Sequence, residues 1–215
     1  MINLQFSTQQ YKVPESFGKY LHEYLKKANT YHTQPQELIK KISEKYGINS
    51  KNLFLTAGAD EAILAISNEF GEKTHIFTPT YVEYTNAERF GYKVIRENSF
   101  NNGSYEIDTN QKNASLIFLA NPGNPIGETS REKIIDLIEN NQQAIVVIDE
   151  VYHEYSPNLT VIDLIEKYDN LIVLRSFSKS FGMAGIRLGF AVSQEKNLKR
   201  IADKVQWANV SYLSV

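Results

Sequence analysis

The chain has 215 residues, of which 42% are hydrophobic and 22% charged, and its formal net charge at pH 7 is -2. This composition is typical of a globular protein, and the near-neutral charge without a basic run gives no electrostatic reason to expect nucleic acid or a membrane surface as a partner. No apolar stretch approaches the roughly 20 residues of a membrane span, and Met1 to Gln10 lacks the features of a signal peptide, so we expect a cytoplasmic protein.

The chain contains no cysteine. This excludes disulfides, zinc–thiolate sites and cysteine nucleophiles. The four histidines are scattered without the spacing of metal ligands, so we expect no metal site. Any covalent chemistry must therefore use another side chain, and lysine and serine are the candidates.

The first 50 residues show two runs of helical periodicity. Apolar residues recur at Phe17, Tyr20, Leu21, Tyr24 and Leu25, and after Pro35 they recur at Leu38, Ile42 and Tyr46. This spacing predicts two helices ahead of the main sheet. We expect residues 1–50 to form an N-terminal helical segment or arm, and residues 51–215 to form one large domain.

From residue 51 onward, short β-branched and aromatic runs alternate with helical patterns. Strands are expected at 52–56, 74–78, 92–96, 115–120, 144–149, 170–175 and 187–193, and helices at 59–70, 81–90, 130–139 and 160–168. In the last helix Val161, Leu164, Ile165 and Tyr168 would share one face. The continuously apolar run 144–148 is typical of a strand buried on both faces. The alternation predicts an α/β fold with a mostly parallel sheet covered by helices on both faces.

Functional side chains follow four of the predicted strands. In open α/β sheets, ligands bind beyond the carboxyl ends of the strands. The segments found there are TAGADE (56–61), NPGNPIG (121–127), DEVY (149–152) and SFSKSFG (176–182). Together they supply a lysine, a carboxylate, a phenol, an amide and a helix N-terminus. A phosphorylated aldehyde that contains a ring nitrogen would use all five.

Lys179 is the candidate covalent residue. A lysine in a loop is usually a solvated cation, so Lys179 alone does not indicate a site. Asp149, however, ends an apolar strand, where a carboxylate is costly unless it is paired or hydrogen-bonded. A protonated pyridine nitrogen would be such a partner, whereas a cap or turn role is the structural alternative. The pair Lys179 and Asp149, with the NPGNPIG turn, favours a functional site.

Three longer segments carry a family resemblance: ANPGNPIG (120–127), VVIDEVYHEY (146–155) and LRSFSKSFGMAGIRLGF (174–190). In order and approximate spacing they resemble the fold type I aminotransferases, which use pyridoxal 5′-phosphate (PLP), and among these the histidinol-phosphate aminotransferase-like group. The segments TAGADEAI (56–63) and FTPTYVEY (77–84) add to the resemblance, which runs from about Thr30 to the end.

The resemblance implies roles toward the PLP ring. Lys179 would form a Schiff base with the cofactor and later move the substrate proton. Asp149 would pair with the pyridinium nitrogen, which keeps the ring an electron sink. Asn124 and Tyr152 would hydrogen-bond the phenolic oxygen of the ring, and Tyr81 would stack on its face. Lys179, Asp149 and Tyr152 are thus the expected catalytic residues.

The resemblance also implies where the phosphate and a second subunit would lie. The phosphate would be held by Ser176, Ser178, Arg187 and the backbone N–H groups of Ala59 and Asp60 at a helix start, where the helix dipole favours an anion. Tyr31 resembles the residue that the family donates across a homodimer interface to the neighbouring phosphate.

Several of these residues have plainer structural interpretations. NPGNPIG alone is a turn cluster, and Arg187 could form an ion pair at a strand edge. Core packing or surface exposure is the default for Tyr81 and Tyr31 in a chain with 13 tyrosines. We assign no role to His153, since a lone histidine after a strand is more often structural.

The expected activity is transamination between an amino donor, such as an amino acid or a histidinol-phosphate-like amino alcohol phosphate, and a 2-oxo acid acceptor. A PLP-dependent lyase or decarboxylase would share every cofactor contact, and a non-catalytic PLP-binding module is a third possibility. The motifs of serine hydrolases and P-loop enzymes are absent.

Two features depart from the family pattern. LQFSTQQYKVP (4–14) lacks the asparagine-containing substrate arm. No residue matches the arginine that grips the substrate carboxylate from a small C-terminal domain in the family. We therefore expect residues 51–215 to be a PLP-binding large domain without that small domain.

Overall fold

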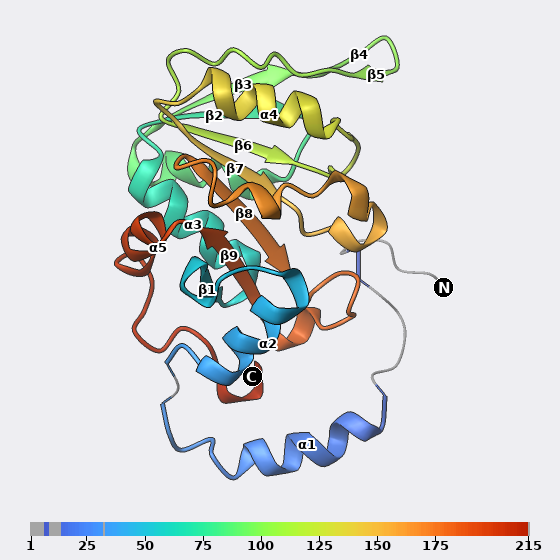
Figure 1. The fold of residues 1–215 in the computed structure, drawn as a ribbon, viewed down its shortest axis with the longest axis vertical. Coiled ribbons are helices and arrows are strands. Elements are labelled where there is room, and N and C mark those ends of the chain that lie inside the picture. Colours follow the sequence, from blue (N-terminus) through green and yellow to red (C-terminus); the bar gives the residue numbers. More distant parts are fainter. Residues whose placement is uncertain (1–6, 9–13, 32, 215) are drawn as a thin grey trace.

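A single large sheet organises the computed structural model, which describes residues 7–8, 14–31 and 33–214 (Figure 1). In this described part of the chain, seven strands follow the order β1-β9-β8-β7-β6-β2-β3. Their bounds are Leu53–Thr56 (β1), Lys73–Thr78 (β2), Lys93–Asn98 (β3), Leu116–Ala120 (β6), Ile145–Asp149 (β7), Leu171–Ser176 (β8) and Gly189–Ser193 (β9). Every strand of this sheet lies within two residues of its predicted position.

Most neighbouring strands are parallel, as predicted. Only β9 differs, since it runs antiparallel to both β1 and β8. The register pairs Ala120 with Asp149 and Asp149 with Leu174, and Gly189 at the start of β9 lies opposite both Thr56 and Ser176. The ends of β1, β6, β7 and β8 therefore meet the beginning of β9 at one edge of the sheet.

Helices cover both faces of the sheet. On one face α2 (Gln36–Tyr46), α4 (Arg131–Asn140) and the segment 161–168 pack against strand residues such as Leu119, Ile148 and Val173. On the other face α3 (Gly58–Phe70) and α5 (Glu195–Ala202) pack against Phe118, Val147 and Leu174. Successive strand residues contribute to opposite clusters because side chains alternate along a strand. This explains the continuously apolar strands in the sequence.

Two predicted helices take a different form. Residues Val82–Phe90 form a 3-10 helix, and in 160–168 only Ile162–Leu164 is a 3-10 turn, so the helix predicted there is wrong. Val161, Ile165 and Tyr168 are buried as the pattern indicated. The backbone at the start of this segment is bound by side chains instead, because Val161 N–H donates to Glu150 and Arg131 donates to the Thr160 carbonyl. These bonds compete with a helical turn.

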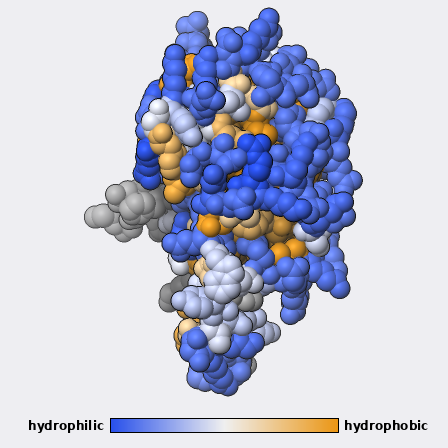
Figure 2. Space-filling model, turned by 90° about the vertical axis from the view of Figure 1, so that its left-hand side faces the viewer, coloured by the Kyte–Doolittle hydropathy of each residue, from blue (hydrophilic) through white to orange (hydrophobic). Residues whose placement is uncertain are grey.

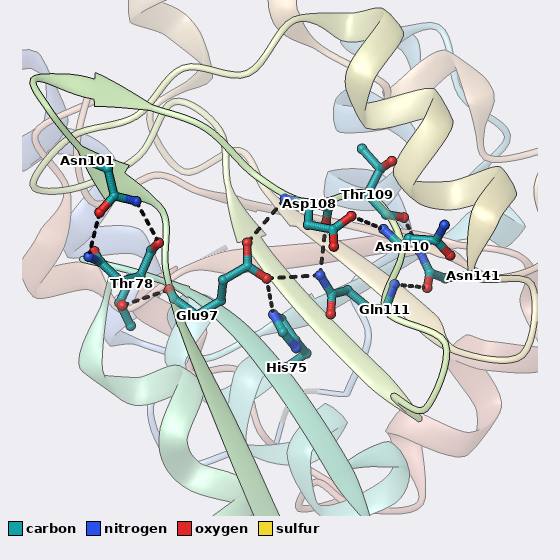
Figure 3. A network of polar contacts seen from close by, with 10 residues as sticks. His75, Thr78, Glu97, Asn101, Asp108, Thr109, Asn110, Gln111 and Asn141 are labelled. Atoms are coloured by element: carbon teal, nitrogen blue, oxygen red, sulfur yellow. Dashed lines mark hydrogen bonds and ion pairs between the residues drawn. The ribbon is translucent and has the colours of Figure 1, made fainter.

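The sequence patterns also missed some elements. Helix α5 and the short hairpin of β4 (Phe100–Asn101) and β5 (Ser104–Tyr105) were not predicted. The hairpin leads into a polar network beside the edge strand β3 (Figure 3). There the Glu97 carboxylate lies 3.0 Å from His75 Nε2 and accepts hydrogen bonds from the Gln111 side chain and the Asp108 N–H. The network fixes the segment 108–111 against β2 and β3.

Helix α1 (Ser16–Leu25) lies apart from the main body (Figure 1). In Figure 2 this region forms a narrow extension below a largely hydrophilic face. Large apolar side chains of α1 are exposed: Phe17, Tyr20, Leu21 and Leu25. The two helices predicted in residues 1–50 are thus present, and one of them has an unpaired apolar surface. Among the described residues, none of the helices has the length and apolar character that crossing a membrane requires.

Candidate functional site

A cavity of about 480 Å³ opens at the sheet edge where these strand ends meet. Its lining includes most of the residues expected to bind the cofactor: Ala59, Asp60, Tyr81, Asn124, Asp149, Tyr152, Ser176, Ser178, Lys179 and Arg187. They come from five segments between Ala59 and Arg187, and the fold brings them together. Tyr31 is the exception, since it is 82% exposed and packs edge-to-face against Trp207 with ring centroids 5.5 Å apart.

Asp149 is buried at the end of β7 and accepts two hydrogen bonds. The Tyr84 hydroxyl donates to Oδ2 at 2.6 Å, and the Val151 N–H donates to Oδ1 at 3.0 Å. Burial raises the pKa of Asp149 from its ordinary 3.8 to about 6, although both hydrogen bonds lower it. The carboxylate is therefore held in a place where a positively charged or N–H-bearing ligand would stabilise it.

A phenol and an amide that line the cavity form a pair. Asn124 Nδ2 donates to the Tyr152 hydroxyl at 3.0 Å. Burial raises the pKa of Tyr152, while hydrogen bonds from Ser7 and Asn124 lower it. Ser7 and Thr8 also line the cavity, which the sequence did not indicate. The pair can direct hydrogen bonds at one oxygen atom of a ligand.

Lys179 follows β8 and lines the cavity near Tyr152. Its Nζ is 5.8 Å from the centre of the Tyr152 ring. Burial is the main cause that lowers the pKa of Lys179, and the charge of Arg187 acts in the same direction, against Asp60 and Asp149. The neighbouring Ser180 hydroxyl donates to Glu154 at 2.8 Å. A lowered pKa makes the neutral, nucleophilic amine more accessible.

The remaining end of the cavity is rich in hydrogen-bond donors. Helix α3 begins there, and the first N–H groups of a helix have no partner within it. The Ser178 N–H donates to Ser176 Oγ at 3.0 Å, and the Ser176 hydroxyl donates to Ser178 Oγ at 2.9 Å. Arg187 Nη2 lies 2.9 Å from Asp60 Oδ2. Hydroxyls, a guanidinium and a helix N-terminus form a donor set suited to a phosphate.

Two glycines allow the close approach of these groups. Gly58 has φ +76°, and a Cβ there would lie 2.6 Å from Arg187 Nη2. A Cβ on Gly189 would lie 2.7 Å from the Gly58 carbonyl carbon. Larger residues would separate the start of α3 from β9 and Arg187. The glycine of the TAGADE motif therefore has a steric reason.

Two tyrosines cover another wall. The Tyr81 hydroxyl donates to Asp60 Oδ1 at 3.0 Å, and its ring meets Tyr84 edge-on with centroids 5.8 Å apart. Sequence reasoning identified Tyr81 and missed Tyr84. The available signal was the spacing, since Tyr84 lies three residues after Tyr81 in the same motif.

A buried ion pair joins the residues next to Asp149 and Ser176 in the chain. Arg175 Nη2 lies 2.6 Å from Glu150 Oε2, and both side chains are at most 2% exposed. Thr160 Oγ1 joins them by donating to Glu150 and accepting from Arg175. Because Glu150 follows Asp149 and Arg175 precedes Ser176, the pair locks the carboxyl ends of β7 and β8 side by side.

The family model for "Aminotransferase class I and II" matches residues 4–214. The histidinol-phosphate aminotransferase of Haloquadratum walsbyi is 35% identical over 78% of this chain and 49% of its own length. That of Thermoanaerobacter pseudethanolicus is 35% identical over 88% of this chain and 57% of its own. The chain thus spans about half the length of these curated relatives.

Solved structures agree with the fold. The histidinol-phosphate aminotransferase of Clostridium acetobutylicum superposes with a TM-score of 0.86 at 24% identity, over 97% of this chain and 65% of that one. The L-threonine-O-3-phosphate decarboxylase of Porphyromonas gingivalis also gives 0.86 at 24% identity, over 100% of this chain and 67% of that one. The family match covers nearly the whole chain, and the sequence relatives agree with it. The protein therefore belongs to the aminotransferase class I and II family.

Proposed function

We propose that this chain binds PLP in the cavity and uses Lys179 to transfer an amino group from an amino donor to a 2-oxo acid. The observation that carries the proposal is the convergence of four chemically different groups on one cavity: the Lys179 amine, the Asp149 carboxylate, the Asn124–Tyr152 pair and the donor-rich start of α3. The sequence relatives support transamination, and the similar histidinol-phosphate aminotransferase of Sinorhizobium meliloti was solved with pyridoxal-5′-phosphate.

The donor set fits PLP group by group. Asp149 would accept a hydrogen bond from the ring nitrogen, and Asn124 and Tyr152 would bind the phenolic oxygen. The phosphate would lie at the start of α3, held by the N–H groups of Ala59 and Asp60 and by Ser176, Ser178 and Arg187. Lys179 would bind the aldehyde carbon. Tyr81, whose ring borders the cavity, would cover one face of the ring.

When bound, PLP supplies an electron sink for negative charge that develops on the substrate. The residues of the chain supply binding, orientation and proton transfer. Asp149 keeps the ring nitrogen protonated by offering it a carboxylate in a buried place. Lys179 Nζ, whose pKa burial lowers, would take the proton from the α-carbon of the donor and deliver it to the carbon two bonds away, on the other side of the amino nitrogen.

We further propose that two copies of the chain associate. Support comes from the exposed apolar residues of α1 and from the exposed pair Tyr31 and Trp207, of which Trp207 is 73% accessible. Residues 1–50 would then act as an arm, and Tyr31 would reach the phosphate bound by the other copy. Residues 51–215 would form the PLP-binding domain.

A half-reaction tests the function directly. The PLP-loaded chain is mixed with single amino donors, including histidinol phosphate, glutamate and aromatic amino acids, without an acceptor. We expect pyridoxamine phosphate and the matching oxo product in equal amounts with at least one donor. Lys179→Ala should slow this conversion by several powers of ten, whereas Lys196→Ala, at a surface ion pair, should not.

Two results would contradict the proposal. Release of carbon dioxide with PLP left unchanged would indicate a decarboxylase instead of a transaminase. Tight PLP binding without conversion of any donor would contradict transamination by this chain and leave PLP binding alone.

A further inference from the structure

Tyr84 makes a short hydrogen bond to the carboxylate that the proposed function assigns to the PLP ring nitrogen. Its hydroxyl lies 2.6 Å from Asp149 Oδ2, and both residues are buried. The distance is typical of an O–H donor and a charged acceptor, whose hydrogen bonds are shorter than those between neutral groups. Tyr84 thus contacts Asp149 directly from the 3-10 helix Val82–Phe90, 65 residues earlier in the chain.

The Tyr84 phenol has little freedom to move. Its ring stacks on Phe118 of β6 with centroids 4.8 Å apart and an interplanar angle of 4°, and Tyr81 meets it edge-on. Burial and the charge of Asp149 raise the pKa of Tyr84 well above its ordinary value, so the hydroxyl keeps its proton and remains a donor. The hydroxyl is therefore aimed at one oxygen of Asp149 by packing on two sides.

The other charged groups around Asp149 do not replace this donor. Burial raises the pKa of Asp149 most, and the Asp60 and Glu150 carboxylates raise it further. Lys179 lines the same cavity as Asp149, and burial lowers the pKa of its amine. The Tyr84 hydroxyl and the Val151 N–H are the contacts that favour the ionised carboxylate.

We propose that Tyr84 is a positioning residue for Asp149, which holds the carboxylate ionised and turned so that its remaining lone pairs face the ring nitrogen of PLP. This inference rests on the proposed function. A phenol is suited to the task because it donates one hydrogen bond and carries no charge that would compete with the ring for Asp149. Without this donor, burial would favour the protonated carboxyl, which is a poor partner for a protonated ring nitrogen.

The conservative variant Tyr84→Phe removes the hydroxyl and keeps the stacking on Phe118. The first measurement is a carbon NMR titration of the Asp149 carboxyl in the cofactor-free chain, assigned by its loss in Asp149→Asn. We expect the pKa of Asp149 to rise by about one unit or more, the size of a hydrogen bond to a charged group. The matched control is Tyr92→Phe. The Tyr92 hydroxyl donates to the Asn68 carbonyl at 3.5 Å instead of to Asp149. This control variant should leave the titration unchanged.

A second variant should shift the pKa of Asp149 in the opposite direction. Incorporation of 3,5-difluorotyrosine at position 84 makes the phenol a stronger donor with nearly the same shape, so the pKa of Asp149 should fall. Unchanged Asp149 titration in both variants would overturn the proposal and leave Tyr84 as a packing residue. If Tyr84→Phe does not fold, the fluorinated chain alone decides, since a pKa that stays or rises contradicts the inference.

Nitrogen NMR of 15N-labelled PLP extends the test to the loaded chain. The ring nitrogen should be protonated in the original chain and lose protonation at lower pH in Tyr84→Phe. A ring nitrogen with the same titration in both chains would contradict the positioning role. Failure of PLP to link to Lys179 would refute the proposed function, whereas the Asp149 titration without cofactor would still report on Tyr84. The two failures are therefore distinguishable.

Discussion

At the scale of single residues, Asp149 lies in a buried environment that disfavours its ionised form. Its pKa in the folded chain is about 6, compared with an ordinary value of 3.8. The folded state therefore binds more protons than the unfolded chain between these two values, so stability falls as the pH rises through this window. Above pH 6 the ionised carboxylate costs roughly 3 kcal/mol of folding free energy. Such a cost is typical of a residue kept for function.

Substitution of Asp149 by Asn should remove this cost. In the cofactor-free chain, Asp149→Asn should raise the free energy of unfolding by about 1–3 kcal/mol at pH 8, and the gain should shrink toward zero at pH 4, where the carboxyl is largely protonated. Urea denaturation at both pH values measures it. Asp136→Asn, on the exposed face of α4, is the control and should change stability little at either pH. An equal gain at pH 4 and pH 8 would show that burial of the charge is not the cause.

The sequence indicated site residues where a local rule applied. Lys179, Asp149 and Asn124 follow predicted strands, and the rule that ligands bind at strand ends is enough to group them in one site. The strand-end rule does not single out Tyr84, because its role depends on contacts with Phe118 and Asp149 that only the folded chain brings about. Ser7 reaches the cavity from the distant N-terminal segment, and no periodicity predicts such a contact. The role predicted for Tyr31 needs a second copy of the chain.

At the scale of elements, the start of α3 is the part of the site most sensitive to backbone geometry. Gly58 has a positive φ, and a Cβ there would push against the Arg187 guanidinium. Gly47, which ends α2, has a similar φ of +67° with nothing within 4 Å of a Cβ. The two positions therefore separate backbone strain from displacement of Arg187.

Both Gly58→Ala and Gly47→Ala should destabilise the chain by about 1–2 kcal/mol, the cost of a left-handed backbone for a residue with a Cβ. Only Gly58→Ala should weaken PLP binding, by about tenfold, because the arginine must move away from the phosphate position. Equilibrium dialysis of PLP against the original chain and the two variants measures the difference. Equal affinities for the two variants would mean that Arg187 does not hold the phosphate.

The elements also show what periodicity can and cannot specify. The strands β6, β7 and β8 were predicted because a strand covered on both faces must be apolar at every position. In 160–168 the same apolar pattern indicated burial, and that was confirmed, but the helix was wrong. Periodicity indicates which residues face the core. The backbone conformation depends here on Glu150 and Arg131, whose side chains hydrogen-bond its polar groups.

At the scale of the whole molecule, the fold explains why residues distant in sequence form one site. Parallel strands place their carboxyl ends at one edge, and the antiparallel β9 begins at that same edge with Arg187 just before it. The buried Glu150–Arg175 pair keeps the central strands in register at this edge. The α/β class and the strand positions could be predicted from the sequence. The antiparallel direction of β9 could not, because a buried strand has the same apolar pattern whether it runs parallel or antiparallel to its neighbours.

The most direct test of the central claim is where PLP attaches. The chain is incubated with PLP, reduced with borohydride and digested, and the modified peptide is identified by mass spectrometry. The account predicts that the phosphopyridoxyl group is found on Lys179, and that Lys179→Ala loses both the label and the cofactor's absorbance shift. A label on another lysine in the original chain, or an unchanged absorbance in Lys179→Ala, would contradict it.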